Sequence, residues 1–259
     1  MFLAIDVGNT QSTLGLFDDE GQLAKGWRMT SNASDTSDML HARLFSYFLK
    51  DGYELADVSA AAVASVVPAL TRAWWRCLGD LLGRSPLLVN ATHDYGMPID
   101  MPNPRTVGAD RIANAIAARN AYGSPVIVVD FGTATNIDVV DGRGAYRGGA
   151  ISPGLMLSAN ALFSKAAKLA SIPVEAPEHA LGDTTETAMQ SGLVIGAAAQ
   201  AEGLVSRMKA ELGIEQAKVI GTGGLARTVS RATDLFDAVD PTLTLRGICE
   251  IWLQQHGGA

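Results

Sequence analysis

Two copies of an Asp-x-Gly motif are the residues of this sequence best suited to chemistry. Asp6 and Gly8 end one apolar run, and Asp130 and Gly132 end another, 124 residues later (130 minus 6). A carboxylate at the end of a buried strand can hold a cation, and glycine lets backbone N–H groups approach a ligand. A lone Asp-x-Gly is usually a plain turn, but two equivalent copies favour a polyphosphate site. The side chains expected to donate to it are those of Asn9, Thr10, Ser12 and Thr133.

Asp110 and Arg111 form a second candidate site at the start of a predicted helix. In an average helix they would be an N-terminal acid and a surface arginine. Here they follow a loop of residues 91–106 that contains Tyr95 and three prolines, and a loop of that length is usually functional. This favours Asp110 as a base for a substrate hydroxyl and Arg111 as a clamp for an anionic group.

A third glycine-rich turn, Gly221-Thr-Gly-Gly224, follows a short predicted strand. Alone it indicates only a helix start, but beside two phosphate turns it suggests close passage of the backbone past a nucleoside. No Gly-x-x-x-x-Gly-Lys-Ser/Thr segment occurs, and the dinucleotide fingerprint is matched only weakly, at residues 221–226. The four histidines are scattered and are expected to be solvated side chains: His41, His93, His179 and His256.

The elements that must position these residues repeat along the chain. Each Asp-x-Gly copy reads as a strand, a tight turn and a returning strand, followed by a third strand and then by alternating helices and strands. Further strands are expected at 22–29, 58–67, 86–90, 145–151, 218–220 and 235–239, and helices at 35–50, from 68, from 110, at 155–169, 185–212, up to 232 and at 243–255. The repeat predicts an α/β protein with one domain at 1–120 and a second at 121–259.

Three glycines lie beside the apolar stripe of the predicted helix 185–212: Gly192, Gly196 and Gly203. Glycine weakens a helix by roughly 1 kcal/mol relative to alanine. We therefore expect close packing against another element, or a kink.

Composition limits the function. The 259 residues are 47% hydrophobic and carry a net charge of -7 without a basic cluster, which makes nucleic-acid binding an improbable main function. Cys77 and Cys249 are expected to be reduced core thiols. We expect a soluble, cytoplasmic protein without a signal peptide or a membrane span, because the first residues lack a basic region and no apolar run reaches ~20 residues.

Six motifs occur in one order along the chain: Asp6-Val-Gly-Asn-Thr10, Gly108-Ala-Asp-Arg111, Asp130-Phe-Gly-Thr-Ala-Thr135, Gly148-Gly-Ala-Ile-Ser-Pro-Gly154, Met189-Gln-Ser-Gly192 and Gly221-Thr-Gly-Gly224. This order resembles the type III pantothenate kinases, of the acetate kinase, sugar kinase, Hsp70 and actin superfamily. The resemblance implies two duplicated ribonuclease H-like (actin-like ATPase) domains, each with a mixed five-stranded sheet flanked by helices.

The resemblance also implies roles for single residues. ATP and Mg²⁺ would be bound by the turn Asp6, Val7, Gly8, Asn9, Thr10, Gln11, Ser12 and Thr13, with Thr133 also contacting ATP. Asp130 would hold a monovalent cation, K⁺ or NH₄⁺. Asp110 would be the proton acceptor, and pantothenate would be held by Tyr95, Gly108, Ala109, Asp110 and Arg111, with Thr185 reaching it across a homodimer interface.

The activity implied is ATP-dependent phosphorylation of pantothenate to 4′-phosphopantothenate, the first step of coenzyme A biosynthesis. Two alternatives stay open. One is a related small-molecule kinase of the same superfamily that acts on another acceptor. The other is an ATP-binding regulatory protein without turnover.

Overall fold

The computed structural model describes residues 1–165 and 171–256, and the chain forms two compact units. Unit 1 comprises Met1–Gly96, Pro102–Ala117 and Leu243–Ala259, and unit 2 comprises Met97–Met101 and Ala118–Thr242. The units therefore differ from a single division at residue 120. The C-terminal segment Leu243–Ala259 belongs to unit 1, and the separate segment Met97–Met101 belongs to unit 2.

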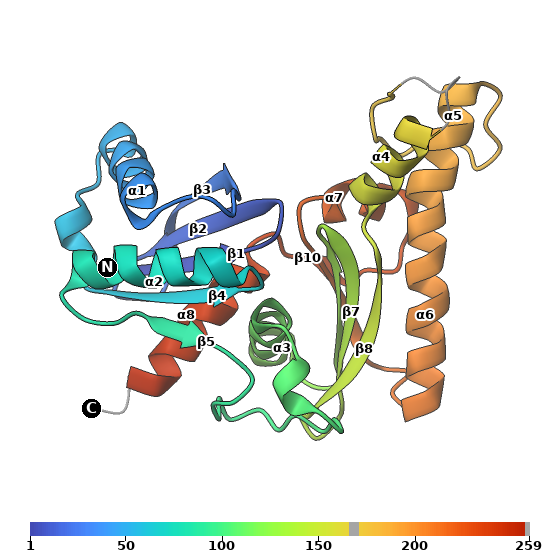
Figure 1. Ribbon diagram of the computed structural model, residues 1–259. Helices are drawn as coiled ribbons and strands as arrows, with labels where there is room; N and C mark the ends of the chain where they lie inside the picture. The colour runs from blue at the N-terminus through green and yellow to red at the C-terminus, as the bar shows by residue number, and fades with distance from the viewer. Residues whose placement is uncertain (166–170, 257–259) are drawn as a thin grey trace. The chain divides into compact units, whose positions relative to one another are not determined.

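Unit 1 is built on a mixed five-stranded sheet (Figure 1). Its strands are β1 (Phe2–Val7), β2 (Gln11–Phe17), β3 (Leu23–Thr30), β4 (Ala60–Ser65) and β5 (Leu87–Val89), in the order β3-β2-β1-β4-β5. β1 pairs antiparallel with β2 and parallel with β4. The alternation expected of a strand sends Leu3, Ile5 and Val7 into one core.

The helices of unit 1 begin and end at residues suited to those positions. They are α1 (Ser37–Asp51), α2 (Pro68–Leu82), α3 (Ala109–Tyr122, of which the residues up to Ala117 belong to this unit) and α8 (Leu243–His256), with short 3₁₀ turns η1 (Leu55–Asp57) and η2 (Pro104–Thr106). The Thr36 side chain accepts a hydrogen bond from the Met39 N–H, and Gly52 ends α1 in the left-handed conformation. Pro68 occupies the first turn of α2, where its missing N–H costs nothing.

The C-terminal helix α8 packs within unit 1. Its Trp252 ring stacks on Phe2 of β1 with centroids 4.8 Å apart, and the Thr244 hydroxyl donates to Asn114 Oδ1 of α3 at 2.7 Å. A β-carbon at Gly247 would collide with the Ala113 carbonyl, so α8 and α3 cross at backbone distance. These contacts explain why the end of the chain joins unit 1.

Unit 2 repeats the same sheet. Its strands are β6 (Val126–Phe131), β7 (Ala134–Val140), β8 (Tyr146–Pro153), β9 (Lys218–Thr222) and β10 (Ala238–Val239), in the order β10-β9-β6-β7-β8. β6 pairs antiparallel with β7 and parallel with β9, as β1 pairs with β2 and β4. The predicted pair of mixed five-stranded sheets flanked by helices is confirmed. The strand predicted at 235–239 is shorter, since only Ala238 and Val239 pair.

The helices of unit 2 differ from the predicted ones in one segment. They are α4 (Leu155–Lys165), α5 (Thr185–Gln190), α6 (Gly196–Leu212) and α7 (Ala226–Val229), with a π-turn η3 (Ser191–Ile195) and a 3₁₀ turn η4 (Ser230–Ala232). The predicted end of the helix at 155–169 lies outside the described residues. Of the two alternatives expected for the helical glycines, close packing is not found at Gly192 or Gly203, because no described atom lies within 4 Å of a β-carbon built at either position. Gly192 instead lies inside the π-turn, and Gly196 follows it directly.

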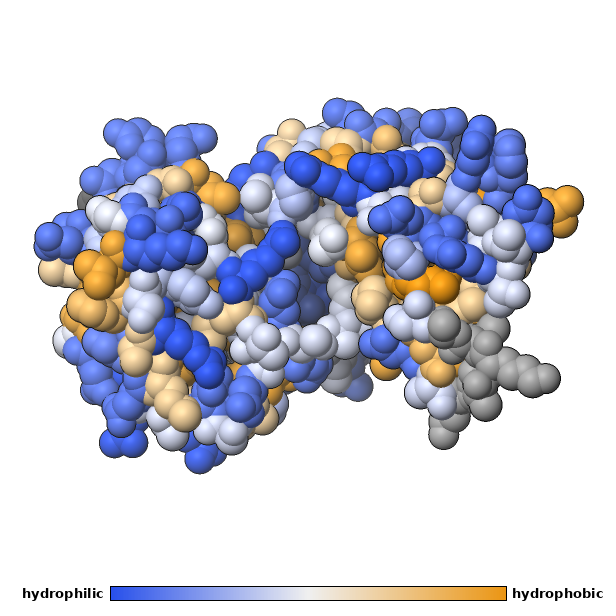
Figure 2. All heavy atoms as spheres, turned by 90° about the horizontal axis from the view of Figure 1, so that it is seen from above, coloured by the Kyte–Doolittle hydropathy of each residue, from blue (hydrophilic) through white to orange (hydrophobic). Residues whose placement is uncertain are grey.

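The surface mixes hydrophilic and hydrophobic residues. Figure 2 shows small hydrophobic groups bordered by hydrophilic ones on the face in view. Exposed large hydrophobic side chains of unit 2 include Ile151, Met156, Leu157, Leu162 and Leu181. Within the described part of the chain, no helix combines the length and apolar character needed to cross a membrane.

Candidate active site

The Asp6 turn closes the β1–β2 hairpin of unit 1. Asp6 is the penultimate residue of β1 and lies opposite Thr13. The Gly8 N–H donates to the Gln11 carbonyl at 3.1 Å, and a β-carbon at Gly8 would lie 2.9 Å from that oxygen. The turn is therefore as tight as expected, and it leaves Asn9, Thr10 and Gln11 exposed to a ligand.

A second contact supports this turn from Ser31, the residue that follows β3. The Ser12 hydroxyl, which is 1% exposed, lies 2.8 Å from the Ser31 hydroxyl, and the Ser31 N–H donates to the Thr10 carbonyl at 3.0 Å. Ser12 was expected to face phosphate. The structure shows it as part of the support beneath the turn.

The Asp130 turn occupies the same place in unit 2, and two glycines from distant parts of the chain press against it. A β-carbon at Gly223 would collide with Asp130 Oδ1 and with the Phe131 backbone, and one at Gly154 would collide with the Gly132 and Thr133 carbonyls. The Gly154 N–H donates to the Thr133 carbonyl at 3.1 Å. The glycine cluster 221–224 thus lies beside the Asp130 turn, and its predicted passage close to a nucleoside stays a prediction.

Gly154 has a larger role than the sequence suggested. In the sequence it is only the last residue of one of the six motifs that carry the resemblance. In the structure no side chain fits where Gly154 passes the Thr133 turn. The sequence offered no signal for this contact, because its partner is more than twenty residues away in sequence.

Asp110 is the second residue of α3, and the environment of one of its carboxylate oxygens differs from that of an ordinary surface aspartate. Its Oδ1 is buried and has no hydrogen-bond partner among the described residues. Burial raises the pKa of the Asp110 carboxyl, against the opposing effects of the Arg111 backbone N–H and the Arg111 charge. A carboxylate of raised pKa and an unsatisfied oxygen is suited to accept a proton.

Tyr95 lies in the interior of unit 1 and is 2% exposed. The Asn90 N–H donates to its hydroxyl oxygen at 3.2 Å, so the phenolic hydrogen is left to donate elsewhere. Burial raises the pKa of Tyr95, and the Asn90 N–H partly offsets this effect. Tyr95 therefore stays a neutral donor and fixes the start of the 91–106 loop.

Thr185 is the first residue of α5 in unit 2 and is exposed. Its neighbours make the cap: the Thr184 hydroxyl accepts from the Thr187 N–H at 3.1 Å, and the Thr187 hydroxyl accepts from the Thr184 N–H at 3.0 Å. The Thr185 hydroxyl is not needed for this reciprocal cap. It is exposed at the start of α5.

The turn at Asp6 suits a metal ion that is coordinated jointly by the protein and by the phosphates of a nucleotide. Residues 1–165 and 171–256 contain no group of three or more His, Cys, Asp or Glu side chains that could hold a metal ion. Mg²⁺ is usually held by one or two carboxylates together with phosphates and water. A single carboxylate beside a tight turn, as at Asp6, suits that arrangement.

Comparison with known proteins gives one consistent family. The family model for type III pantothenate kinase matches residues 2–207. A type III pantothenate kinase from Moorella thermoacetica is 42% identical over 248 residues, covering 96% of this chain and 97% of that protein. Another from Thermomicrobium roseum is 42% identical over 256 residues, covering 99% and 98%.

Solved structures agree on the fold. Component A of (R)-2-hydroxyglutaryl-CoA dehydratase from Acidaminococcus fermentans superposes with a TM-score of 0.58 at 15% identity, covering 100% of this chain and 99% of that one. The inorganic polyphosphate/ATP-glucomannokinase from an Arthrobacter species gives 0.51 at 15% identity, covering 98% of each chain. At these identities the similarity concerns the fold alone, which is that of the actin-like ATPases and sugar kinases.

Proposed function

The chain belongs to the type III pantothenate kinase family, and we propose that it transfers the γ-phosphoryl group of ATP to the primary hydroxyl of pantothenate. The product is 4′-phosphopantothenate, and the reaction opens coenzyme A biosynthesis. One observation carries this proposal: two type III pantothenate kinases share 42% of their residues with nearly the whole chain.

Asp110 acts as the base in this proposal. Phosphoryl transfer needs a residue that orients the hydroxyl and accepts its proton. The buried Oδ1 of Asp110 is suited to that hydrogen bond, and the raised pKa of the carboxyl makes it a better proton acceptor than an ordinary aspartate. Arg111 and Tyr95 would bind the rest of pantothenate, with Gly108 and Ala109 shaping the backbone around it.

The two Asp-x-Gly turns would bind the nucleotide. The tight turn after Asp6, from Val7 to Thr13, would offer backbone N–H groups to the phosphates, and Thr133 would contact ATP in unit 2. Asp6 would hold Mg²⁺, and Asp130 would hold K⁺ or NH₄⁺. When bound, these cations would neutralise negative charge on the phosphates, which is the main chemical requirement of the transfer.

A homodimer is part of the proposal. The exposed Thr185 would contact pantothenate bound to the neighbouring subunit. We also place the reaction in the cytoplasm, in keeping with two buried free cysteines, Cys77 and Cys249.

An acceptor panel tests the function. ADP release is measured with ATP and Mg²⁺, with and without K⁺, for pantothenate and for other small hydroxyl and carboxylate acceptors. We expect pantothenate-dependent ADP release that increases with K⁺ or NH₄⁺. Turnover only with another acceptor would indicate a related kinase, and ATP binding without turnover on any acceptor would indicate a regulatory protein.

A further inference from the structure

The middle of the 91–106 loop is docked on the edge of the unit 2 sheet. Met97–Met101 belongs to unit 2, although the chain before and after it belongs to unit 1. Ile99 forms a parallel bridge with Tyr146 of the edge strand β8. The Tyr146 N–H donates to the Pro98 carbonyl at 2.8 Å, and the Asp100 N–H donates to the Tyr146 carbonyl at 2.9 Å. A single bridge at Ile99 thus attaches the segment between Tyr95 and the Gly108 block to the edge of the sheet.

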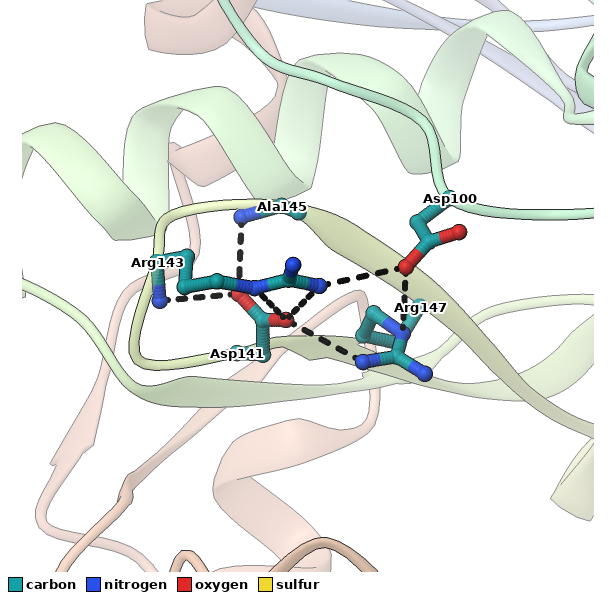
Figure 3. Close-up of polar contacts among 5 residues, drawn as sticks. All are labelled: Asp100, Asp141, Arg143, Ala145 and Arg147. Carbon is teal, nitrogen blue, oxygen red and sulfur yellow. Dashed lines mark hydrogen bonds and ion pairs between the residues drawn. The ribbon is translucent and has the colours of Figure 1, made fainter.

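An ionic network adds to this docking (Figure 3). Asp100 Oδ2 lies 3.2 Å from Nη2 of Arg143 and 3.5 Å from Nε of Arg147. Both arginines also contact Asp141 Oδ2, at 3.1 Å and 3.2 Å. Two carboxylates and two guanidinium groups therefore form a closed set, in which Asp100 is the one member from the loop.

Asp141 holds both arginines toward the loop. Its Oδ1 accepts the N–H groups of Arg143 at 2.9 Å and of Ala145 at 3.0 Å, which fixes the β7–β8 turn. Burial raises the pKa of Asp141, but hydrogen bonds from Ala145, Arg143 and Arg147 outweigh that effect and leave the pKa lowered. Asp141 therefore stays charged, and it contacts both arginines in addition to their contacts with Asp100.

Met101 of the loop packs beside Gly148 of β8. Gly148 of β8 has a φ of +93°, and a β-carbon there would lie 3.5 Å from the Met101 sulfur. The loop is thus fixed by backbone pairing at Ile99, by packing at Met101 and by charge at Asp100.

We propose that Asp100, with Arg143 and Arg147, is a tether that positions the 91–106 loop for pantothenate binding. This rests on the proposed function, because Tyr95 and the Gly108 block are the residues assigned to pantothenate. Asp100 is 57% exposed and Arg143 is 71% exposed, and exposed ion pairs contribute little to global stability. We therefore expect loss of these ion pairs to change KM for pantothenate and to leave the free energy of unfolding nearly unchanged. Asp100 is a positioning residue and touches no substrate.

Steady-state kinetics of Asp100→Asn test the tether. We expect KM for pantothenate to rise about three- to tenfold, which is what one or two exposed ion pairs contribute, while KM for ATP stays within about twofold. Asp100→Glu keeps the charge and should fall near wild type. Asp234→Asn, which alters an exposed aspartate of the same unit, is the matched control. Equal rises in both KM values, or no change in either, would overturn the tether.

Two further readouts separate positioning from a structural role. Raising ionic strength with tetramethylammonium chloride at fixed K⁺ should raise the wild-type KM for pantothenate toward that of Asp100→Asn, since salt screens exposed pairs. Hydrogen exchange should be faster at residues 97–101 of the variant and unchanged in the rest of the sheet. Unchanged exchange at residues 97–101 would overturn the tether, whether or not the protein phosphorylates pantothenate. Failure of the wild-type protein to phosphorylate pantothenate would refute the proposed function.

Discussion

A β-carbon placed on Gly108 would lie 2.5 Å from Oδ1 of Asp110. Real β-carbons do not approach an oxygen so closely, so only glycine leaves the carboxylate in its present position. The oxygen concerned is the buried one without a hydrogen-bond partner among the described residues. The glycine of the Gly108-Ala-Asp-Arg111 motif is thus explained by the space that the proposed base requires.

Gly108→Ala should lower kcat with little loss of folding. The added methyl group would displace the Asp110 carboxylate, and a shift of about 1 Å in a reacting group can cost roughly 100-fold in rate. Gly79→Ala is the control, since no described atom lies within 4 Å of a β-carbon there. Turnover and urea unfolding of both variants check this. A Gly108→Ala enzyme with wild-type kcat would show that Asp110 is not the base, or that it need not be held in place.

The pH profile should reflect the raised pKa of Asp110, which follows from burial of its carboxyl. The base must be ionised, so the acidic limb of kcat/KM is expected above the ordinary aspartate pKa of about 4. Rate measurements between pH 4 and 9 check this. A limb at or below that value, with Asp110 as the titrating group, would contradict the burial.

Stability should vary with pH in the sense set by the same shift. A carboxyl whose pKa is higher in the folded state stabilises the fold below its unfolded pKa, and this contribution is lost as the pH rises through the folded pKa. The unfolding free energy of the wild-type protein should therefore fall relative to Asp110→Asn over that window and then stay constant. Urea unfolding of both proteins at several pH values measures the difference. A rise with pH would mean that the charged form is favoured by folding.

Gly223→Ala should weaken ATP binding and cation activation. A β-carbon there meets Asp130 Oδ1 and the Phe131 backbone, and Gly223 has a φ of +89° that disfavours any side chain. Gly224→Ala is the matched control in the same turn, because a β-carbon at Gly224 meets no described atom within 4 Å. KM for ATP and the response to K⁺ should change in the first variant alone. If Gly223→Ala and Gly224→Ala had the same KM for ATP and the same response to K⁺, the contact between Gly223 and Asp130 would have no role in ATP binding or in cation activation.

Gly203→Ala should stabilise the protein. Gly203 lies within α6 with no described atom near its missing β-carbon, and alanine is favoured over glycine in a helix by roughly 1 kcal/mol. Gly213→Ala should do the opposite, since Gly213 ends α6 with a φ of +63°. Thermal unfolding of the two variants tests the pair. A destabilised Gly203→Ala protein would imply close packing that the described residues do not show.

Local patterns predicted most of the fold. The apolar runs and the repeated Asp-x-Gly turn were enough to predict the strands and their duplication, because these signals lie within a few residues of one another, and the resemblance to a known family supplied the two five-stranded sheets. The π-turn at Ser191–Ile195 and the short β10 were not predicted, since tertiary contacts set them. The place of α8 was not predicted either, because it depends on Phe2 and Ala113, more than a hundred residues away in sequence.

The candidate site was predicted in its residues and not in its contacts. The Asp6, Asp110 and Asp130 motifs carry their own signals. Gly223 approaches Asp130 closely, and Gly154 approaches Thr133 closely. Arg143 forms an ion pair with Asp100. Each of these contacts joins residues distant in sequence, so no single motif contains it, and the two close approaches explain why glycine is needed at residues 154 and 223.

The most direct measurement is phosphorus NMR of the reaction products of ATP, Mg²⁺, K⁺ and pantothenate, with wild-type protein and with Asp110→Asn. We expect the wild type to form a phosphomonoester coupled to the methylene protons of the pantothenate primary hydroxyl, together with ADP. The variant, which retains the fold, should form it about 10²–10⁴-fold more slowly, the usual effect of losing a well-placed base. A phosphorylated product at another position, no product with the wild type, or full activity of Asp110→Asn would contradict the proposed reaction or its base.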